Sequence, residues 1–198
     1  FFEKLESRAK EIDSLLCVGL DPHPVELQEN TAGAAKVFCL QLIEATYPYA
    51  LAFKPNAAFF EALGAEGWEA LKTVIKAIPE GIPVILDAKR GDISSTAQAY
   101  AASAFEVLGA DAITLSPYLG YDSLAPFLTN PEKGVFLLCK TSNPGSVDLQ
   151  DLQLGGQQAA LMVYEKVAGL AHDWGMRGNL GLVVGATFPE ALQRVRKL

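Results

Sequence analysis

Three observations predict an α/β fold, a TIM (βα)8 barrel. Six apolar runs of strand length alternate with segments whose apolar residues recur at helical spacing. Several of these predicted strands end in an ionisable or hydroxylated residue, and TIM barrels carry their functional groups at many strand tips. Neither a G-x-G-x-x-G nor a G-K-[ST] loop occurs. This absence disfavours the alternative, an open doubly wound sheet that binds its ligand at one switch point.

The elements follow one another in a regular order. Residues 3–14 predict a short helix with one apolar edge. The predicted strands are residues 15–20, 50–53, 82–86, 111–115, 135–139 and 180–185. The first of them is continuously apolar, so we expect both of its faces to be covered. Helices are predicted over residues 33–46, 68–78, 97–108, 123–128 and 160–174, and a last helix opens with a capping box at residues 187–190. Residues 146–156 are polar and unpatterned, and we expect this long loop to act as a lid.

Length, composition and charge restrict the kind of protein. The 198 residues are 50% hydrophobic and 20% charged, which predicts a single domain over residues 1–198 with a sizeable core. The net charge is −7 and no basic run occurs, so we expect no nucleic acid and no membrane surface as partner. No apolar stretch approaches the ~20 residues of a membrane span, and the first residues do not resemble a signal peptide. We therefore expect a cytoplasmic protein with a small-molecule partner.

The cysteines and histidines do not form a metal-binding pattern. Cys17, Cys39 and Cys139 are far apart and have no C-x-x-C spacing, so we interpret them as buried free thiols. His23 and His172 lack the paired spacing of metal ligands and are interpreted as structural or exposed. The sequence therefore predicts no metal site.

The strongest candidate for a site is the charged stretch after the third predicted strand. Asp87, Lys89 and Asp92 follow the apolar run of residues 82–86. Because strand side chains alternate between faces, Asp87 and Lys89 should point the same way, and a turn at Gly91 can bring Asp92 beside them. The pattern D-x-K-x-x-D thus predicts an acid–base–acid cluster. The simpler alternative is a solvated loop with a surface salt bridge.

Ile93 and Thr96 extend this pattern to D-x-K-x-x-D-I-x-x-T. With them the sequence resembles the orotidine 5'-monophosphate decarboxylases, in the D-A-K-R-G-D-I form of one bacterial branch. Ser94 stands where the family pattern suggests glycine or another small residue. The resemblance covers the chain in order and implies a TIM barrel, of which about six of eight βα units are expected here, because a barrel typically needs about 250 residues. Two family segments that bind the substrate phosphate, Pro-Gly-x-Gly-Ala-Gln-Gly-Gly and a later Ser-Arg, are not found.

The resemblance implies decarboxylation of orotidine 5'-monophosphate to uridine 5'-monophosphate and CO2, without a cofactor. It implies that Lys89 is the proton donor and that Asp87 and Asp92 hold it in place. Further roles are implied at other positions. Asp21 and Lys54 would bind ribose hydroxyls and support the charges, Ser142 would contact the pyrimidine, and Asp92, Ile93 and Thr96 would reach the active site of a partner in a homodimer. For each of Asp21, Lys54 and Ser142, a purely structural role is the alternative. Asp21 would cap a turn, Lys54 would be a surface lysine, and Ser142 would also cap a turn.

Three other functions remain open at this point. A Mg²⁺-dependent sugar-phosphate decarboxylase of the same superfamily shares D-x-K-x-x-D, but it should carry a carboxylate where Lys54 stands. A Schiff-base aldolase would use Lys89 as nucleophile, although neighbouring carboxylates favour the charged ammonium over the neutral amine that this chemistry needs. The third alternative is an inactive barrel fragment, because we expect the present chain to lack its phosphate-binding segments.

Overall fold

The computed structural model describes residues 1–155 and 161–198. The chain divides into two compact units. Unit 1 consists of Phe1–Ala88 and Gln98–Thr114, and unit 2 consists of Lys89–Ala97 and Leu115–Leu198. None of the helices in the described residues is both long and apolar enough to cross a membrane.

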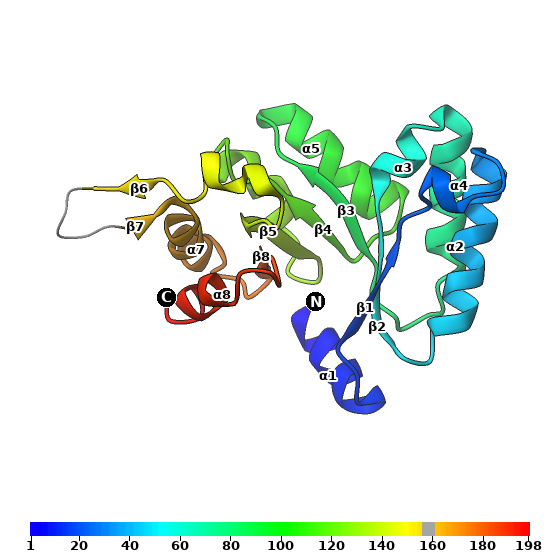
Figure 1. Ribbon diagram of the computed structural model, residues 1–198, viewed down its shortest axis with the longest axis horizontal. Helices are drawn as coiled ribbons and strands as arrows, with labels where there is room; N and C mark the ends of the chain where they lie inside the picture. The colour runs from blue at the N-terminus through cyan, green and yellow to red at the C-terminus, as the bar shows by residue number, and fades with distance from the viewer. Residues whose placement is uncertain (156–160) are drawn as a thin grey trace. The chain divides into compact units, whose positions relative to one another are not determined.

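Unit 1 is built on parallel strands that neighbour one another in chain order (Figure 1). The strands are β1 (Leu16–Leu20), β2 (Ala50–Pro55), and most of β3 (Ile85–Arg90) and β4 (Ala112–Leu115). β1 pairs with β2, single bridges at Phe53↔Val84 and Asn56↔Asp87 connect β2 to β3, and β3 lies next to β4. Because the strands are parallel and sequential, their C-terminal ends meet at one edge, where charged side chains can gather.

Helices pack around these strands in unit 1. They are α1 (Phe2–Ile12), the 3₁₀ turn η1 (Pro24–Glu26), α2 (Ala32–Thr46), α3 (Ala57–Glu61), α4 (Gly64–Ala77) and the π-helical turn η2 (Ser103–Val107) that continues α5 (Ser94–Ala102). The side chain of Thr31 caps α2, since its Oγ1 accepts a hydrogen bond from the Ala34 N–H at 3.2 Å. α2 and α4 lie side by side (Figure 1). Fully buried side chains include Leu20, Phe53, Phe60, Leu71, Val74 and Ile113.

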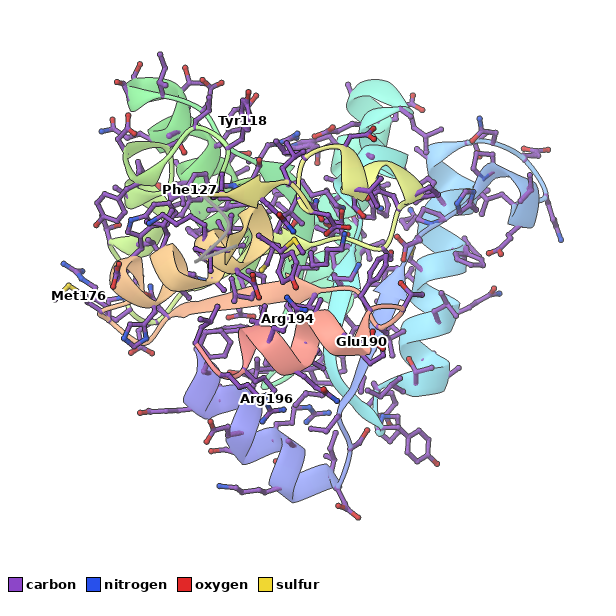
Figure 2. The ribbon with its side chains drawn as sticks, turned by 60° about the vertical axis from the view of Figure 1, so that its left-hand side comes forward. Tyr118, Phe127, Met176, Glu190, Arg194 and Arg196 are labelled. Atoms are coloured by element: carbon purple, nitrogen blue, oxygen red, sulfur yellow. The ribbon has the colours of Figure 1, made fainter. Side chains whose placement is uncertain are left out.

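Unit 2 is centred on the parallel strands β5 (Gly134–Lys140) and β8 (Leu180–Val184). Its helices are η3 (Tyr121–Ser123), α6 (Ala125–Leu128), η4 (Pro144–Asp148), α7 (Val163–Trp174) and α8 (Pro189–Val195), and a short antiparallel pair is formed by β6 (Gln153–Leu154) and β7 (Leu161–Met162). Cys139, Tyr164, Ala168 and Ala191 form a buried cluster between β5, α7 and α8. Figure 2 labels Glu190, Arg194 and Arg196 on and next to α8, and Arg194 Nη1 lies 3.5 Å from Glu165 Oε1 of α7.

The predicted alternation of strands and helices is confirmed. Strands β1, β2, β3, β4, β5 and β8 occupy the six predicted positions. The third strand is displaced, because β3 begins at Ile85 and continues through Asp87 and Lys89 to Arg90. Asp87 and Lys89 therefore lie within the strand, whereas Asp92 follows it.

Three local predictions were wrong. β1 is not covered on both faces, since Leu16 is 49% exposed and Cys17 is exposed as well. β1 pairs with β2 alone among the described strands, so its other side has no neighbour there. The last helix has Phe188 rather than Thr187 at its N-cap, with no side-chain hydrogen bond. The loop predicted over residues 146–156 contains part of η4 and the strand β6. Gly156 of this loop and Ala160 of the next predicted helix lie outside the described residues.

The prediction for the cysteines holds for two of them. Cys39 and Cys139 are free and buried, and burial raises the pKa of each thiol to about 12. Cys17 was predicted to be buried and is exposed, because it lies on the uncovered strand β1. His23 and His172 are exposed, and the His23 ring packs on Phe59 with a centroid distance of 4.6 Å.

Candidate active site

An ion pair between neighbouring strands is the centre of the candidate site. Lys54 of β2 and Asp87 of β3 are joined by a 3.0 Å contact between Nζ and Oδ2. The bridge between Asn56 and Asp87 sets the two strands in this register. Asp87 is 8% exposed, so its charge is kept away from bulk water and its interaction with the ammonium is screened less than at the surface.

Thr114 on β4 completes the contacts of this carboxylate, and sequence analysis missed it. Thr114 Oγ1 donates a hydrogen bond to Asp87 Oδ1 at 2.8 Å and accepts one from the Ala88 N–H at 3.1 Å. Thr114 is buried. Both oxygens of Asp87 are thus engaged, one by an ammonium and the other by a hydroxyl. This arrangement fixes the carboxylate in one orientation.

Asp21 lies just after β1, as predicted from the sequence. A Cβ on Gly19 would lie 2.4 Å from Asp21 Oδ2, so glycine at this position leaves room for the carboxylate. In residues 1–155 and 161–198, no hydrogen-bond or ion-pair partner is recorded for the Asp21 side chain. Its oxygens can therefore accept hydrogen bonds from a ligand hydroxyl.

Lys89 occupies an unusual backbone conformation on β3. Its φ is 48°, in the left-handed region that a residue with a side chain occupies at a cost of about 1–2 kcal/mol. The Lys89 side chain is exposed. Because this residue departs from extended backbone, alternation along the strand does not by itself fix the direction of the ammonium relative to Asp87. Such backbone strain often occurs at functional positions.

The turn after Lys89 is tight at Gly91. A Cβ there would meet the Ser116 carbonyl oxygen at 2.9 Å, and the Ser116 N–H donates to the Arg90 carbonyl oxygen at 2.7 Å. Asp92 follows, and its Oδ1 accepts a hydrogen bond from the Ile93 N–H at 2.8 Å. The predicted turn through Gly91 is therefore present, and glycine is required because of this close approach.

The remaining predicted residues lie at exposed positions of unit 2. Ile93 is 57% exposed, and Thr96 in the first turn of α5 and Ser142 after β5 are exposed as well. The structure thus brings Lys54 and Asp87 into direct contact within unit 1. The predicted residues of unit 2 are Lys89, Asp92, Ile93, Thr96 and Ser142.

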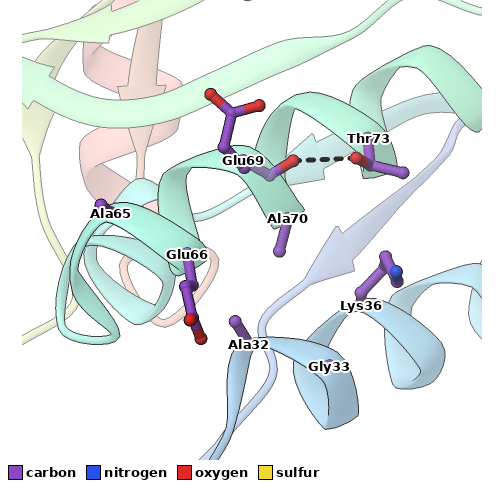
Figure 3. A pocket seen from close by; sticks show the side chains of 8 residues that line it. All are labelled: Ala32, Gly33, Lys36, Ala65, Glu66, Glu69, Ala70 and Thr73. Carbon is purple, nitrogen blue, oxygen red and sulfur yellow. Dashed lines mark hydrogen bonds between the residues drawn. The ribbon is translucent and has the colours of Figure 1, made fainter.

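A surface pocket elsewhere in unit 1 contains none of these residues. It lies between α2 and α4 (Figure 3) and is lined by Ala32, Gly33, Lys36, Ala65, Glu66, Glu69, Ala70 and Thr73. Its one hydrogen bond drawn in Figure 3 runs within α4, from Thr73 Oγ1 to the Glu69 carbonyl oxygen at 2.9 Å. In the described part of the chain, no group of three or more His, Cys, Asp or Glu side chains is placed to hold a metal ion.

The fold and this charge arrangement define an α/β protein of the TIM-barrel class with ionisable groups at the tips of neighbouring parallel strands. Residues 14–198 match the family model described as "Orotidine 5'-phosphate decarboxylase / HUMPS family". The chain belongs to this family.

Individual relatives agree with the family match. The chain is 54% identical over 201 residues to an orotidine 5'-phosphate decarboxylase of Roseiflexus castenholzii, covering 100% of the chain and 72% of that relative. It is 51% identical over 202 residues to that of Herpetosiphon aurantiacus, covering 100% of the chain and 74% of the relative.

Solved structures share the fold. A Leishmania donovani OMP decarboxylase superposes with a TM-score of 0.91 at 59% identity, over 99% of this chain and 74% of that one. A putative orotidine-monophosphate decarboxylase from Toxoplasma gondii superposes with a TM-score of 0.93 at 44% identity, over 100% of this chain and 74% of that one. The predicted TIM-barrel class is confirmed by these relatives.

Proposed function

We propose that this protein decarboxylates orotidine 5'-monophosphate to uridine 5'-monophosphate and CO2, as a step of pyrimidine biosynthesis and without a cofactor. The observation that carries the proposal is the buried carboxylate of Asp87, which is held by Lys54 at 3.0 Å and by Thr114 at 2.8 Å on the strand that also bears Lys89. The substrate is a nucleotide, in agreement with the names of the relatives.

The chemical difficulty of this reaction is a carbanion on the pyrimidine ring, formed as CO2 leaves. A fixed positive charge stabilises such an anion and can deliver the proton that replaces CO2. We assign the proton transfer to the Lys89 ammonium. Asp87 and Asp92 hold that ammonium in place, because opposite charges attract one another.

The other assignments concern substrate binding. Asp21 and Lys54 bind ribose hydroxyls, and Ser142 contacts the pyrimidine ring. An open carboxylate on Asp21 and an exposed hydroxyl on Ser142 are suited to these roles. We also propose that residues 1–198 belong to one barrel domain and that the protein acts in the cytoplasm.

The alternative metal-dependent decarboxylase is less compatible with the site. A Mg²⁺ ion at the tip of β2 would need carboxylate ligands, whereas the side chain there is the Lys54 ammonium in contact with Asp87. A Schiff-base role for Lys89 needs a neutral amine. Turnover in the presence of a chelator and the absence of borohydride trapping would separate decarboxylation from both alternatives.

A Lys89→Ala variant tests the proposal. In a protein carrying these 198 residues, we expect decarboxylation to fall by at least about a thousandfold, within the range that general acid catalysis contributes. Binding of uridine 5'-monophosphate should persist, because ground-state binding is shared by several strand tips. Lys166→Ala on the exposed side of α7 is the matched control. Turnover of Lys89→Ala within tenfold of the unaltered protein would show that Lys89 is not the acid.

We further propose a homodimer in which Asp92, Ile93 and Thr96 reach the active site of the partner subunit. The exposure of Ile93, a large apolar side chain beside a charged motif, supports a contact at this position.

Mixing two inactive variants tests the contribution across the dimer. A heterodimer of Lys89→Ala and Asp92→Ala would contain one site with both defects and one site with neither. Under random exchange, up to about a quarter of the unaltered activity should return, since half of the dimers are mixed and half of their sites are intact. If subunit exchange is demonstrated and activity does not return, Asp92 acts within its own subunit.

A further inference from the structure

Lys140 is a buried lysine at the end of β5 that the proposed mechanism does not use. It is 2% exposed. Its Nζ lies 2.7 Å from Asp151 Oδ1 and 3.0 Å from Ser146 Oγ, and it sits 4.5 Å above the ring of Phe188. A buried ammonium is costly unless its partners satisfy it. The Lys140 ammonium therefore contacts Asp151 and Ser146 from the segment after β5 and Phe188 from the segment after β8.

The segment between Lys140 and Asp151 is closed on itself by hydrogen bonds. The Thr141 N–H donates to Gln150 Oε1 at 2.8 Å, and Gln150 Nε2 donates to Thr141 Oγ1 at 2.8 Å. The Ser146 N–H donates to the Asn143 carbonyl oxygen at 3.0 Å. Backbone and side-chain groups on both sides of Ser142 are thus fixed in one arrangement.

Ser142 itself has a different environment. Across the part of the chain that the structure describes, no hydrogen-bond partner is recorded for its hydroxyl, and the residue is exposed. Its neighbours are held while its own donor and acceptor remain available to a ligand.

The end of β8 packs directly against Ser142. A Cβ on Gly185 would lie 3.0 Å from Ser142 Cβ and 3.1 Å from its backbone nitrogen. The Gly185 N–H donates to the Lys140 carbonyl oxygen at 2.7 Å. Glycine at position 185 therefore lets the tip of β8 approach the tip of β5, and a larger residue would displace Ser142.

We infer that Lys140, Asp151 and Gly185 are positioning residues that hold the Ser142 hydroxyl in place for the pyrimidine ring of the nucleotide. The inference rests on the proposed function, because it takes the contact between Ser142 and the ring from there. Lys140 anchors the segment through its contacts with Asp151 and Ser146, and Gly185 sets the distance of Ser142 from β8. Preorganisation of this kind reduces the cost of ordering a loop when ligand binds.

Two variants test the inference, each with a matched control. Lys140→Met removes the charge and leaves Asp151, whose side chain is 34% exposed, able to contact water. Gly185→Ala displaces Ser142 without changing any charge. The controls are Lys166→Met and Gly169→Ala on α7, where a Cβ on Gly169 meets no atom within 4 Å.

The measurement is calorimetric binding of two probes, uridine 5'-monophosphate and ribose 5-phosphate, which lacks the base. Both variants should bind uridine 5'-monophosphate about tenfold more weakly, as expected for the loss of one well-placed hydrogen bond. Ribose 5-phosphate should bind within about twofold of the unaltered protein. A merely structural defect would instead weaken both probes together, and that result would overturn the inference.

Ser142→Ala separates failure of this inference from failure of the proposed function. If Ser142→Ala weakens uridine 5'-monophosphate binding while Lys140→Met and Gly185→Ala do not, the positioning role is wrong and the contact of Ser142 stands. If Ser142→Ala has no effect on that affinity, the proposed contact with the pyrimidine is itself wrong and the inference falls with it.

Discussion

At the scale of single residues, Asp87 shows how the sequence produces a fixed charge. It is buried on β3, and a lysine from one neighbouring strand and a threonine from the other each contact one of its oxygens. Removing one hydrogen-bond partner of a buried carboxylate costs more than that bond contributes to stability, because the carboxylate stays buried with fewer partners. The orientation of Asp87 therefore depends on Thr114 as well as on Lys54.

This dependence gives a prediction for Thr114. Thr114→Val keeps the shape of the side chain and removes the hydroxyl. It should therefore lower the free energy of unfolding by about 1–3 kcal/mol. It should also lower turnover, with little change in ligand affinity. Thr114→Ser keeps the hydroxyl and is the matched control. Denaturant unfolding of both variants measures the free energy of unfolding, and steady-state kinetics measures turnover. Equal behaviour of the valine and serine variants would mean that the hydroxyl does not hold Asp87.

A second prediction at this scale concerns Ser94. Its φ is 48°, where a side chain costs about 1–2 kcal/mol and glycine does not. Ser94→Gly should therefore stabilise the protein by up to about 1 kcal/mol, after the larger unfolded-state entropy of glycine is subtracted. Ser95→Gly, inside the first turn of α5, should instead destabilise it by about 0.5–1 kcal/mol. Thermal unfolding distinguishes the two, and destabilisation by both would contradict the strained backbone at Ser94.

At the scale of elements, two helix glycines have opposite roles. A Cβ on Gly67 of α4 would lie 1.9 Å from the Phe60 carbonyl oxygen of α3, whereas one on Gly169 of α7 would meet nothing within 4 Å. Gly67→Ala should thus force α3 and α4 apart and destabilise the protein by at least about 1–3 kcal/mol, as overpacking does. Gly169→Ala should stabilise it by up to about 1 kcal/mol through helix propensity. Chemical denaturation of both variants is the measurement, and a tolerated Gly67→Ala would contradict the close packing of α3 on α4.

The element scale also shows what the sequence could predict. Apolar periodicity located all six parallel strands, since burial on a sheet imposes the pattern. It missed the full length of β3, because hydrogen bonds such as that from Ser116 to Arg90 continue past the apolar residues. It also predicted a cover for β1 that residues 1–155 and 161–198 do not provide, because periodicity reports the tendency of a strand to be buried and not which neighbour is present.

The candidate site was predictable in part for the same reason. Charged strand tips identified Lys54 and Asp87, and their contact is observed. Thr114 was missed because a threonine inside an apolar run reads as an ordinary strand former. The burial of Lys140 was missed because its partner Asp151 lies in a segment whose polar composition predicted only a loop. The contacts of Thr114 with Asp87 and of Asp151 with Lys140 are tertiary contacts, and they leave no trace in the apolar periodicity of the sequence.

At the scale of the whole molecule, the residues that we assign to the site are divided between the two compact units of the chain. The boundary between them falls inside β3, between Ala88 and Lys89. Asp87 therefore belongs to one unit and Lys89 to the other, although only one residue separates them on the strand. In the function that we propose, the carboxylate and the ammonium act on one substrate, so turnover is the property that tests both assignments.

The decisive measurement is turnover of orotidine 5'-monophosphate in D2O, with the product analysed by mass spectrometry and NMR. The Lys89 ammonium exchanges its protons with solvent, so the unaltered protein should release uridine 5'-monophosphate with one deuterium on the ring carbon that lost CO2. Lys89→Ala should form this product at least about a thousandfold more slowly than the unaltered protein. Product without deuterium at that carbon, or deuterated product from Lys89→Ala at a rate within tenfold of the unaltered protein, would contradict the assignment of Lys89 as the proton donor.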